Sequence, residues 1–157
     1  MSHSLKIATI LPYKENYTFL KAQAAAIWVC DFYKYSKFKD DNFIFGNTKG
    51  SDYLTKNYIN IKINNLKSKF SSSTNEYCKN FIKKTKNDKF DIIEIHNRPL
   101  VFNYLNKEIN SKYILYFHND PLSMNGSKSI NERLKLLDEL DKIIFVSKWV
   151  QNRFFEK

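Results

Sequence analysis

Two short polar segments of this sequence combine residue types that can carry out acid–base chemistry. Residues 96–99 read His-Asn-Arg-Pro and residues 118–121 read His-Asn-Asp-Pro, and each segment directly follows an apolar run. Histidine titrates near neutral pH, arginine binds phosphate or carboxylate with parallel hydrogen bonds, and aspartate can orient an imidazole. The segments therefore predict a site that includes His96, Asn97, Arg98, His118, Asn119 and Asp120. The alternative is that His-Asn-x-Pro merely ends a strand; its occurrence after two strands favours the functional interpretation.

Ser147 also follows an apolar run, at residues 142–146, and is a further candidate binding residue at a strand end. Its position before a helical stretch predicts a helix N-cap, and no G-x-S-x-G segment supports a hydrolase nucleophile there. His96, His118 and Asp120 lack the short spacing of metal ligands, so no metal is expected. Glu94, in the middle of a predicted strand, faces either a neighbouring polar pocket or the sheet edge.

The elements that position these residues follow from the alternation of apolar runs and helical stretches. Strands are predicted at 5–11, 42–45, 58–63, 91–95, 112–117 and 142–146. Helices are predicted at 17–35, from a cap at Ser73 or Thr74 to 86, from Pro99 to 109, at 130–139, and from Ser147 onward. Strands that alternate with helices form parallel sheets covered on both faces. The predicted fold is α/β: a Rossmann-like three-layer domain with a mostly parallel sheet of about six strands.

Composition narrows the class of protein further. A chain of 157 residues with 43% hydrophobic residues forms one core, so residues 1–157 are predicted to be a single domain. The longest run without a charged residue, 22–30, has nine residues, fewer than a membrane span needs. Two cysteines without metal-ligand spacing indicate reduced thiols and a cytoplasmic protein. Three glycines, at 46, 50 and 126, exclude the glycine-rich dinucleotide and P-loop motifs.

The formal net charge of +10 is concentrated in one stretch. Residues 49–89 hold ten lysines against Asp52, Glu76 and Asp88, a surplus of +7. Only three arginines occur in the chain, which argues against nucleic acid as a partner. Peripheral contact with an anionic membrane is one interpretation, and a solvated lysine face is the other. The membrane interpretation uses one predicted helix face and two aromatic anchors: Lys79, Lys83, Lys84, Lys86, Phe70 and Tyr77.

Four segments in register, at 6–12, 90–99, 116–121 and 141–147, resemble the N-terminal domain of retaining glycosyltransferases with the GT-B fold, in particular glycosyltransferase family 4. The resemblance covers essentially the whole chain. It implies an acceptor-binding domain that works with a second, nucleotide-sugar-binding domain absent from this chain. It places His118 beside the sugar-transfer centre and His96 and Asn97 on the acceptor side.

The resemblance implies transfer of a sugar from a nucleotide-sugar co-substrate to a glycan or lipid-linked cell-envelope acceptor, without a metal or another cofactor. The family's glycines after the first strand are absent here, where residues 13–18 read Tyr-Lys-Glu-Asn-Tyr-Thr, and Lys14 is the candidate replacement for donor-phosphate contact. On this interpretation the domain alone is inactive. A non-enzymatic Rossmann-like binding or regulatory module is the alternative function.

Overall fold

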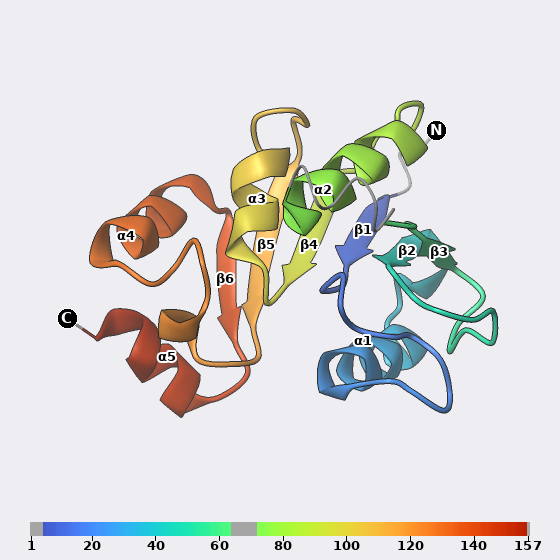
Figure 1. Ribbon diagram of the computed structural model, residues 1–157, viewed down its shortest axis with the longest axis horizontal. Helices are drawn as coiled ribbons and strands as arrows, with labels where there is room; N and C mark the ends of the chain where they lie inside the picture. Colours follow the sequence, from blue (N-terminus) through green and yellow to red (C-terminus); the bar gives the residue numbers. More distant parts are fainter. Residues whose placement is uncertain (1–4, 64–71, 157) are drawn as a thin grey trace.

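The computed structural model describes residues 5–63 and 72–156, and in them six strands form a single parallel sheet (Figure 1). The strands are β1 (Ile7–Ile10), β2 (Asn42–Gly46), β3 (Tyr58–Asn60), β4 (Ile92–His96), β5 (Lys112–Phe117) and β6 (Lys142–Phe145). Their order is β3-β2-β1-β4-β5-β6, and every neighbouring pair is parallel. The predicted α/β, Rossmann-like fold is therefore confirmed. The direction of strand addition reverses between β1 and β4, where open α/β sheets bind ligands.

Helices lie on both sides of this sheet. They are α1 (Ala24–Tyr35), α2 (Ser73–Lys84), α3 (Pro99–Leu105), α4 (Ile130–Glu139) and α5 (Lys148–Phe155), with short 3₁₀ turns at Lys39–Asp41 and Pro121–Ser123. Figure 1 shows α2 and α3 on one side and α1 on the other. The helix starts are locally encoded: Ser72, Ser129 and Ser147 accept hydrogen bonds from backbone N–H groups of the first turn.

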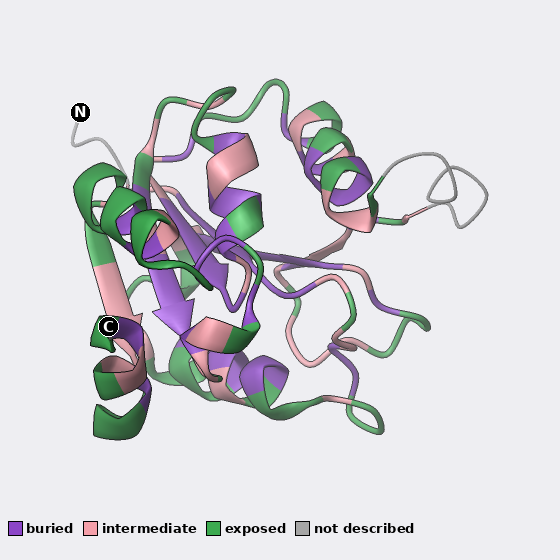
Figure 2. Cartoon of the chain, turned by 60° about the vertical axis from the view of Figure 1, so that its left-hand side comes forward, coloured by how far each residue is buried: buried purple, intermediate pink, exposed green. Residues whose placement is uncertain are grey.

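The two faces of the sheet bury different side chains. Ala8 and Ile10 of β1 join the larger core beneath α2 and α3, which also contains Phe81, Phe102 and Leu115. The smaller core lies under α1 and is built from Leu11, Tyr17, Val29, Cys30, Tyr33 and Ile44. Figure 2 shows these buried positions concentrated in the strands and on the inner sides of the helices. Successive side chains of a strand point to opposite faces of the sheet. Thr9, which lies between Ala8 and Ile10, therefore projects toward α1.

Several predicted boundaries are wrong. The cap of α2 is Ser72 rather than Ser73 or Thr74, and this helix ends at Lys84 rather than at residue 86. The first helix begins at Ala24 rather than at residue 17, because Tyr17 is buried in the α1 core and stacks on Tyr58 with ring centroids 4.9 Å apart. The strand predicted at 58–63 ends at Asn60, and the helix predicted to reach 109 ends at Leu105. Within residues 5–63 and 72–156, no helix has the length and apolar character needed to cross a membrane.

Candidate functional site

The ends of β4 and β5 bring the two His-Asn segments together. His96 is paired with Tyr116 in the sheet, so the next residues of both strands emerge side by side at the carboxyl edge. Asn97 has a left-handed backbone, with φ of 53°, a conformation that asparagine tolerates better than most residues. Its side-chain Oδ1 accepts hydrogen bonds from the backbone N–H of His118 at 2.7 Å and of Asn119 at 3.3 Å. Asn97 therefore fixes the loop that carries His118.

The two histidines form a hydrogen-bonded pair. His96 Nδ1 lies 2.8 Å from His118 Nε2. His96 is only 1% exposed and stacks on Tyr116, with centroids 4.5 Å apart and planes at 7°. Trp28 of α1 presents its ring edge-on to His118 at 5.3 Å. Burial lowers the pKa of His96 far below its usual value and that of His118 to about 4, so both rings are neutral near pH 7.

This hydrogen bond couples the tautomers of the two rings. One proton lies between His96 Nδ1 and His118 Nε2, so the two remaining ring nitrogens share a single proton between them. His96 Nε2 is buried and has no hydrogen-bond partner among the described residues. His118 is half-buried, which leaves it as the member of the pair nearer to solvent. The arrangement gives His118 a neutral nitrogen that can donate or accept, depending on the tautomer of His96.

A buried polar network lies behind the pair, on the α1 face of the sheet. Glu94 accepts hydrogen bonds from Thr9 Oγ1 at 2.8 Å and from Tyr116 Oη at 3.2 Å. Thr9 Oγ1 also lies 2.9 Å from Asn42 Oδ1. Burial raises the pKa of Glu94, and these hydrogen bonds offset part of that rise. Of the two predicted surroundings for Glu94, the polar pocket is therefore correct, and through Tyr116 it supports the ring of His96.

A polar cleft of about 390 Å³, here called the Arg98 cleft, opens at the carboxyl edge, among the loops that follow β4 and β5. Its lining combines side-chain amides, two cations and one aromatic ring: Asn97, Asn119, Asn125, Arg98, Lys128 and Tyr13. The structure thus brings together three of the predicted residues, Asn97, Arg98 and Asn119. His118 does not line the cleft, but its neighbours in the network do, because Asn97 holds the backbone of both His118 and Asn119.

A second cleft of about 340 Å³, here called the Lys14 cleft, also has Tyr13 in its lining. It contains the predicted residue Lys14 together with Lys49, Asn16 and Asn47. Asn47 Nδ2 donates to the backbone oxygen of Tyr13 at 2.9 Å and so positions the loop after β1. Tyr13 is therefore the common wall of the two clefts.

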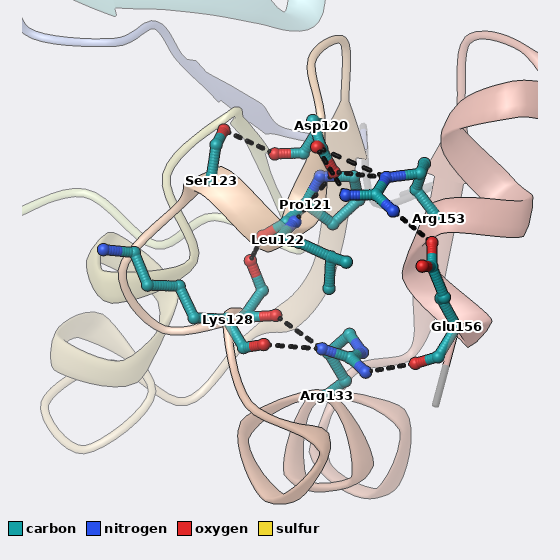
Figure 3. A network of polar contacts seen from close by, with 9 residues as sticks. Asp120, Pro121, Leu122, Ser123, Lys128, Arg133, Arg153 and Glu156 are labelled. Atoms are coloured by element: carbon teal, nitrogen blue, oxygen red, sulfur yellow. Dashed lines mark hydrogen bonds and ion pairs between the residues drawn. The ribbon is translucent and has the colours of Figure 1, made fainter.

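Asp120 and Ser147 have structural roles, as Figure 3 shows for Asp120. Asp120 forms an ion pair with Arg153 of α5 at 3.1 Å and accepts from the backbone N–H of Leu122 at 3.0 Å. The hydrogen bond from Arg153 lowers the pKa of Asp120. The expectation that Asp120 orients an imidazole is therefore wrong. Ser147 caps α5 by accepting from Val150 N at 3.2 Å, as predicted, and it lines neither cleft.

The charge-bearing helix differs from its predicted form. Lys79, Lys83 and Lys84 are exposed on α2, but Lys86 lies beyond the end of that helix. Tyr77 is no surface anchor, because it is 1% exposed and its hydroxyl donates to the backbone oxygen of Leu11. Phe70, the second predicted anchor, lies outside the described residues.

Several residues of the site were not individually predicted, among them Tyr13, Trp28, Asn125, Lys49 and Lys128. The position of Tyr13 after the first strand was a usable signal, because ligand sites in parallel sheets gather at strand ends. No local pattern marks Trp28 or Lys128, since their place depends on how α1 and the loop before α4 fold back. In the described part of the chain, no three His, Cys, Asp or Glu side chains are grouped as metal ligands would be.

Comparison with known families and with curated proteins returns no match for this sequence.

Proposed function

We propose that this chain is the acceptor-binding domain of a retaining glycosyltransferase of the GT-B type. On this proposal, a nucleotide sugar bound by a second domain donates its sugar to a glycan or lipid-linked cell-envelope acceptor held at the carboxyl edge of this sheet. The single observation that carries the proposal is the Arg98 cleft, a polar cleft at the ends of β4 and β5 whose Asn97 also holds the backbone of His118.

The lining of the Arg98 cleft suits a polyhydroxylated ligand. The amides of Asn97, Asn119 and Asn125 offer both donors and acceptors, which is what sugar hydroxyl groups require. Tyr13 adds an aromatic surface on which a sugar ring can pack. Sugar transfer needs the acceptor hydroxyl held in line with the donor and needs charge stabilised as the phosphate departs. We assign the first task to these amides and place His118 beside the reacting hydroxyl.

The neutral state of His118 fits this role. Its pKa of about 4 leaves the ring uncharged at neutral pH, able to accept a hydrogen bond from a hydroxyl or to donate one. A charged imidazolium can only donate. The chain's own contribution to transfer is therefore to bind the acceptor, orient one hydroxyl and exchange a hydrogen bond with it. No metal enters this proposal.

A non-enzymatic binding module is the second candidate, and one surface favours it. Trp28, Phe32 and Tyr35 of α1 line an open, mainly apolar hollow of about 420 Å³. Phe32 is 50% exposed and Tyr35 is 90% exposed, so two aromatic rings of one helix are open to solvent in this hollow. A protein that used this surface alone would not need the Arg98 cleft.

The proposal includes a cytoplasmic location with optional peripheral contact at an anionic membrane. Both cysteines are buried free thiols, which a reducing compartment preserves. Lys79, Lys83 and Lys84 give α2 an exposed basic face. Each lysine near an anionic surface contributes about 1 kcal/mol, so vesicle binding would fall steeply with salt. Co-sedimentation with anionic and neutral vesicles tests this part, with the three lysines changed together to glutamine.

The central experiment measures acceptor binding to the chain itself. Oligosaccharides and lipid-linked sugars are screened by ligand-observed NMR, with Asn97→Ala and Asn119→Ala as the cleft variants. We expect saturable binding of at least one sugar ligand and its loss in Asn119→Ala, whose exposed side chain contributes little to folding. Ser147→Ala is the matched control outside the cleft. Sugar binding that survives both cleft variants would refute the assignment.

A further inference from the structure

Four cations gather around Tyr13, two in each of the neighbouring clefts. Arg98 and Lys128 line the Arg98 cleft, and Lys14 and Lys49 line the Lys14 cleft. No carboxylate belongs to the described lining of either cleft. Hollows lined by one sign of charge concentrate counter-ions, because their low-dielectric walls focus the field. The two clefts together therefore form a positive region that shares the Tyr13 ring.

Arg98 is held in place by a backbone oxygen and an aromatic ring, neither of which neutralises its charge. One of its terminal nitrogens, Nη1, donates to the backbone oxygen of Asn97 at 2.8 Å, and its guanidinium carbon lies 5.7 Å from the centre of the Tyr13 ring. A guanidinium has five N–H donors, so most of them stay available to a ligand. Arg98 also interacts with Glu15: burial raises the pKa of Glu15, and the charge of Arg98 offsets part of that rise. Glu15 Oε2 accepts from the backbone N–H of Ala26 at 3.0 Å and does not line the cleft.

The other three cations are also outside the ion pairs formed among residues 5–63 and 72–156. Those pairs involve other cations of the chain: Lys6, Lys34, Lys56, Lys135 and Arg153. Lys14, Lys49 and Lys128 are all exposed. By contrast, the exposed Lys83 and Lys84 of α2 line neither the Arg98 cleft nor the Lys14 cleft. They therefore provide a control with equal charge in a different place.

We propose that the two clefts bind a phosphorylated ligand across Tyr13. Its phosphate lies against Arg98 and Lys128, its hydroxyl groups face the amides of the Arg98 cleft, and Lys14 and Lys49 hold a second anionic group of the same ligand. A neutral sugar would use the amides and leave the cations without a partner. Phosphate suits both cations, because arginine binds it with parallel hydrogen bonds and lysine with a compact charge. The inference rests on the proposed function for one point, that the ligand is the acceptor.

The experiment measures binding of pyrophosphate and of glucose 1-phosphate to the chain by isothermal titration at low salt. Arg98→Gln with Lys128→Gln removes one pair of charges, Lys14→Gln with Lys49→Gln the other, and Lys83→Gln with Lys84→Gln is the control. We expect each cleft pair to weaken pyrophosphate binding by about tenfold or more, the range for lost charge-assisted hydrogen bonds. The control should weaken it by less than about twofold. Arg98→Lys keeps the charge and should fall between wild type and Arg98→Gln.

Three outcomes would overturn the inference. Equal weakening of pyrophosphate binding in the control pair would show that the overall charge of the chain, rather than the two clefts, explains the effect. Absence of pyrophosphate binding at low salt would remove the anion site, while sugar binding in the preceding experiment would leave the acceptor-domain proposal standing. A nucleoside diphosphate that binds far more tightly than pyrophosphate would identify the donor as the source of the phosphate and refute the acceptor assignment. Circular dichroism of every variant checks that the fold is intact.

Discussion

His96 Nδ1 and His118 Nε2 lie 2.8 Å apart, although helix α3 and strand β5 separate the two residues in the chain. His96 is fully buried and His118 is partly open to solvent. A single proton lies between His96 Nδ1 and His118 Nε2. The tautomer of the buried His96 ring therefore determines whether the free nitrogen of His118 donates or accepts a hydrogen bond. A change at a buried residue can thus alter the chemistry offered at the carboxyl edge of the sheet.

The first prediction concerns stability in acid. Burial lowers the pKa of His118 from 6.5 to about 4, so the unfolded chain binds more protons between these values. The contribution of His118 to the free energy of unfolding is therefore complete above the pKa of the unfolded chain, and it is lost as the pH falls from about 6.5 toward 4. Solvent screening of the half-buried ring reduces its size, and we expect a loss of about 1–2 kcal/mol.

Urea unfolding at a series of pH values measures this loss. Glu94 contributes with the opposite sign, because burial raises the pKa of its carboxyl group. Comparison of the wild type with His118→Gln cancels the contribution of Glu94 and leaves that of the hydrogen-bonded histidine pair. A difference between the two proteins that stays constant from neutral pH down to about pH 5 would contradict the prediction.

The second prediction concerns turnover by an enzyme that joins this domain to its proposed nucleotide-sugar domain. His118→Ala should lower the turnover number by roughly 10²- to 10⁴-fold, the range for a positioned acid–base or hydrogen-bonding group. Ser147→Ala, which removes only the cap of α5, should keep turnover near the wild-type value. Normal turnover by a well-folded His118→Ala enzyme would exclude His118 from the transfer centre.

The third prediction concerns the network behind the pair. Thr9 is 1% exposed, and its hydroxyl lies within hydrogen-bond distance of Glu94 and Asn42. Thr9→Val leaves these buried groups with one partner fewer and should lower the free energy of unfolding by about 1–3 kcal/mol. Thr9→Ser keeps the hydroxyl and should recover most of the polar contribution. Equal stability of Thr9→Val and wild type in urea would show that the network adds nothing to the fold.

The fourth prediction separates Asp120 from the histidines. Asp120→Asn breaks the ion pair with Arg153 and should lower the midpoint of thermal unfolding. It should leave the titration of His118 unchanged, because Asp120 has no contact with either imidazole. NMR titration of the histidine ring protons measures this. Arg153→Gln, which removes the other partner of the ion pair with Asp120, is the matched variant. A clear shift of the His118 titration in Asp120→Asn would restore Asp120 to the site.

The fifth prediction concerns the chain by itself. Residues 1–157 are expected to bind the acceptor and yet to transfer no sugar, since the proposed donor site lies on another domain. Radiolabelled nucleotide sugars with a bound acceptor provide the assay. Robust transfer by this chain alone would refute the division of labour between two domains.

Much of the architecture was determined by the sequence itself. The alternation of apolar runs and helical stretches predicted all six strands, because burial on both faces makes strands of a parallel sheet continuously apolar. The N-cap role of Ser147 also followed from local chemistry, since a cap depends only on the next three residues. The polar residues at strand ends were predicted to gather at one edge, and Asn97, Arg98 and Asn119 do so.

Only the tertiary structure decided which of these side chains act together. Asp120 and Arg153 are 33 residues apart, and their contact depends on how α5 packs against the turn after β5. The pairing of His96 with His118 depends on β4 and β5 being neighbours in register. Tyr77 points inward because its helix face, not its residue type, meets the sheet. Local patterns encode elements, whereas strand order, register and helix rotation arise from the packing of the whole core.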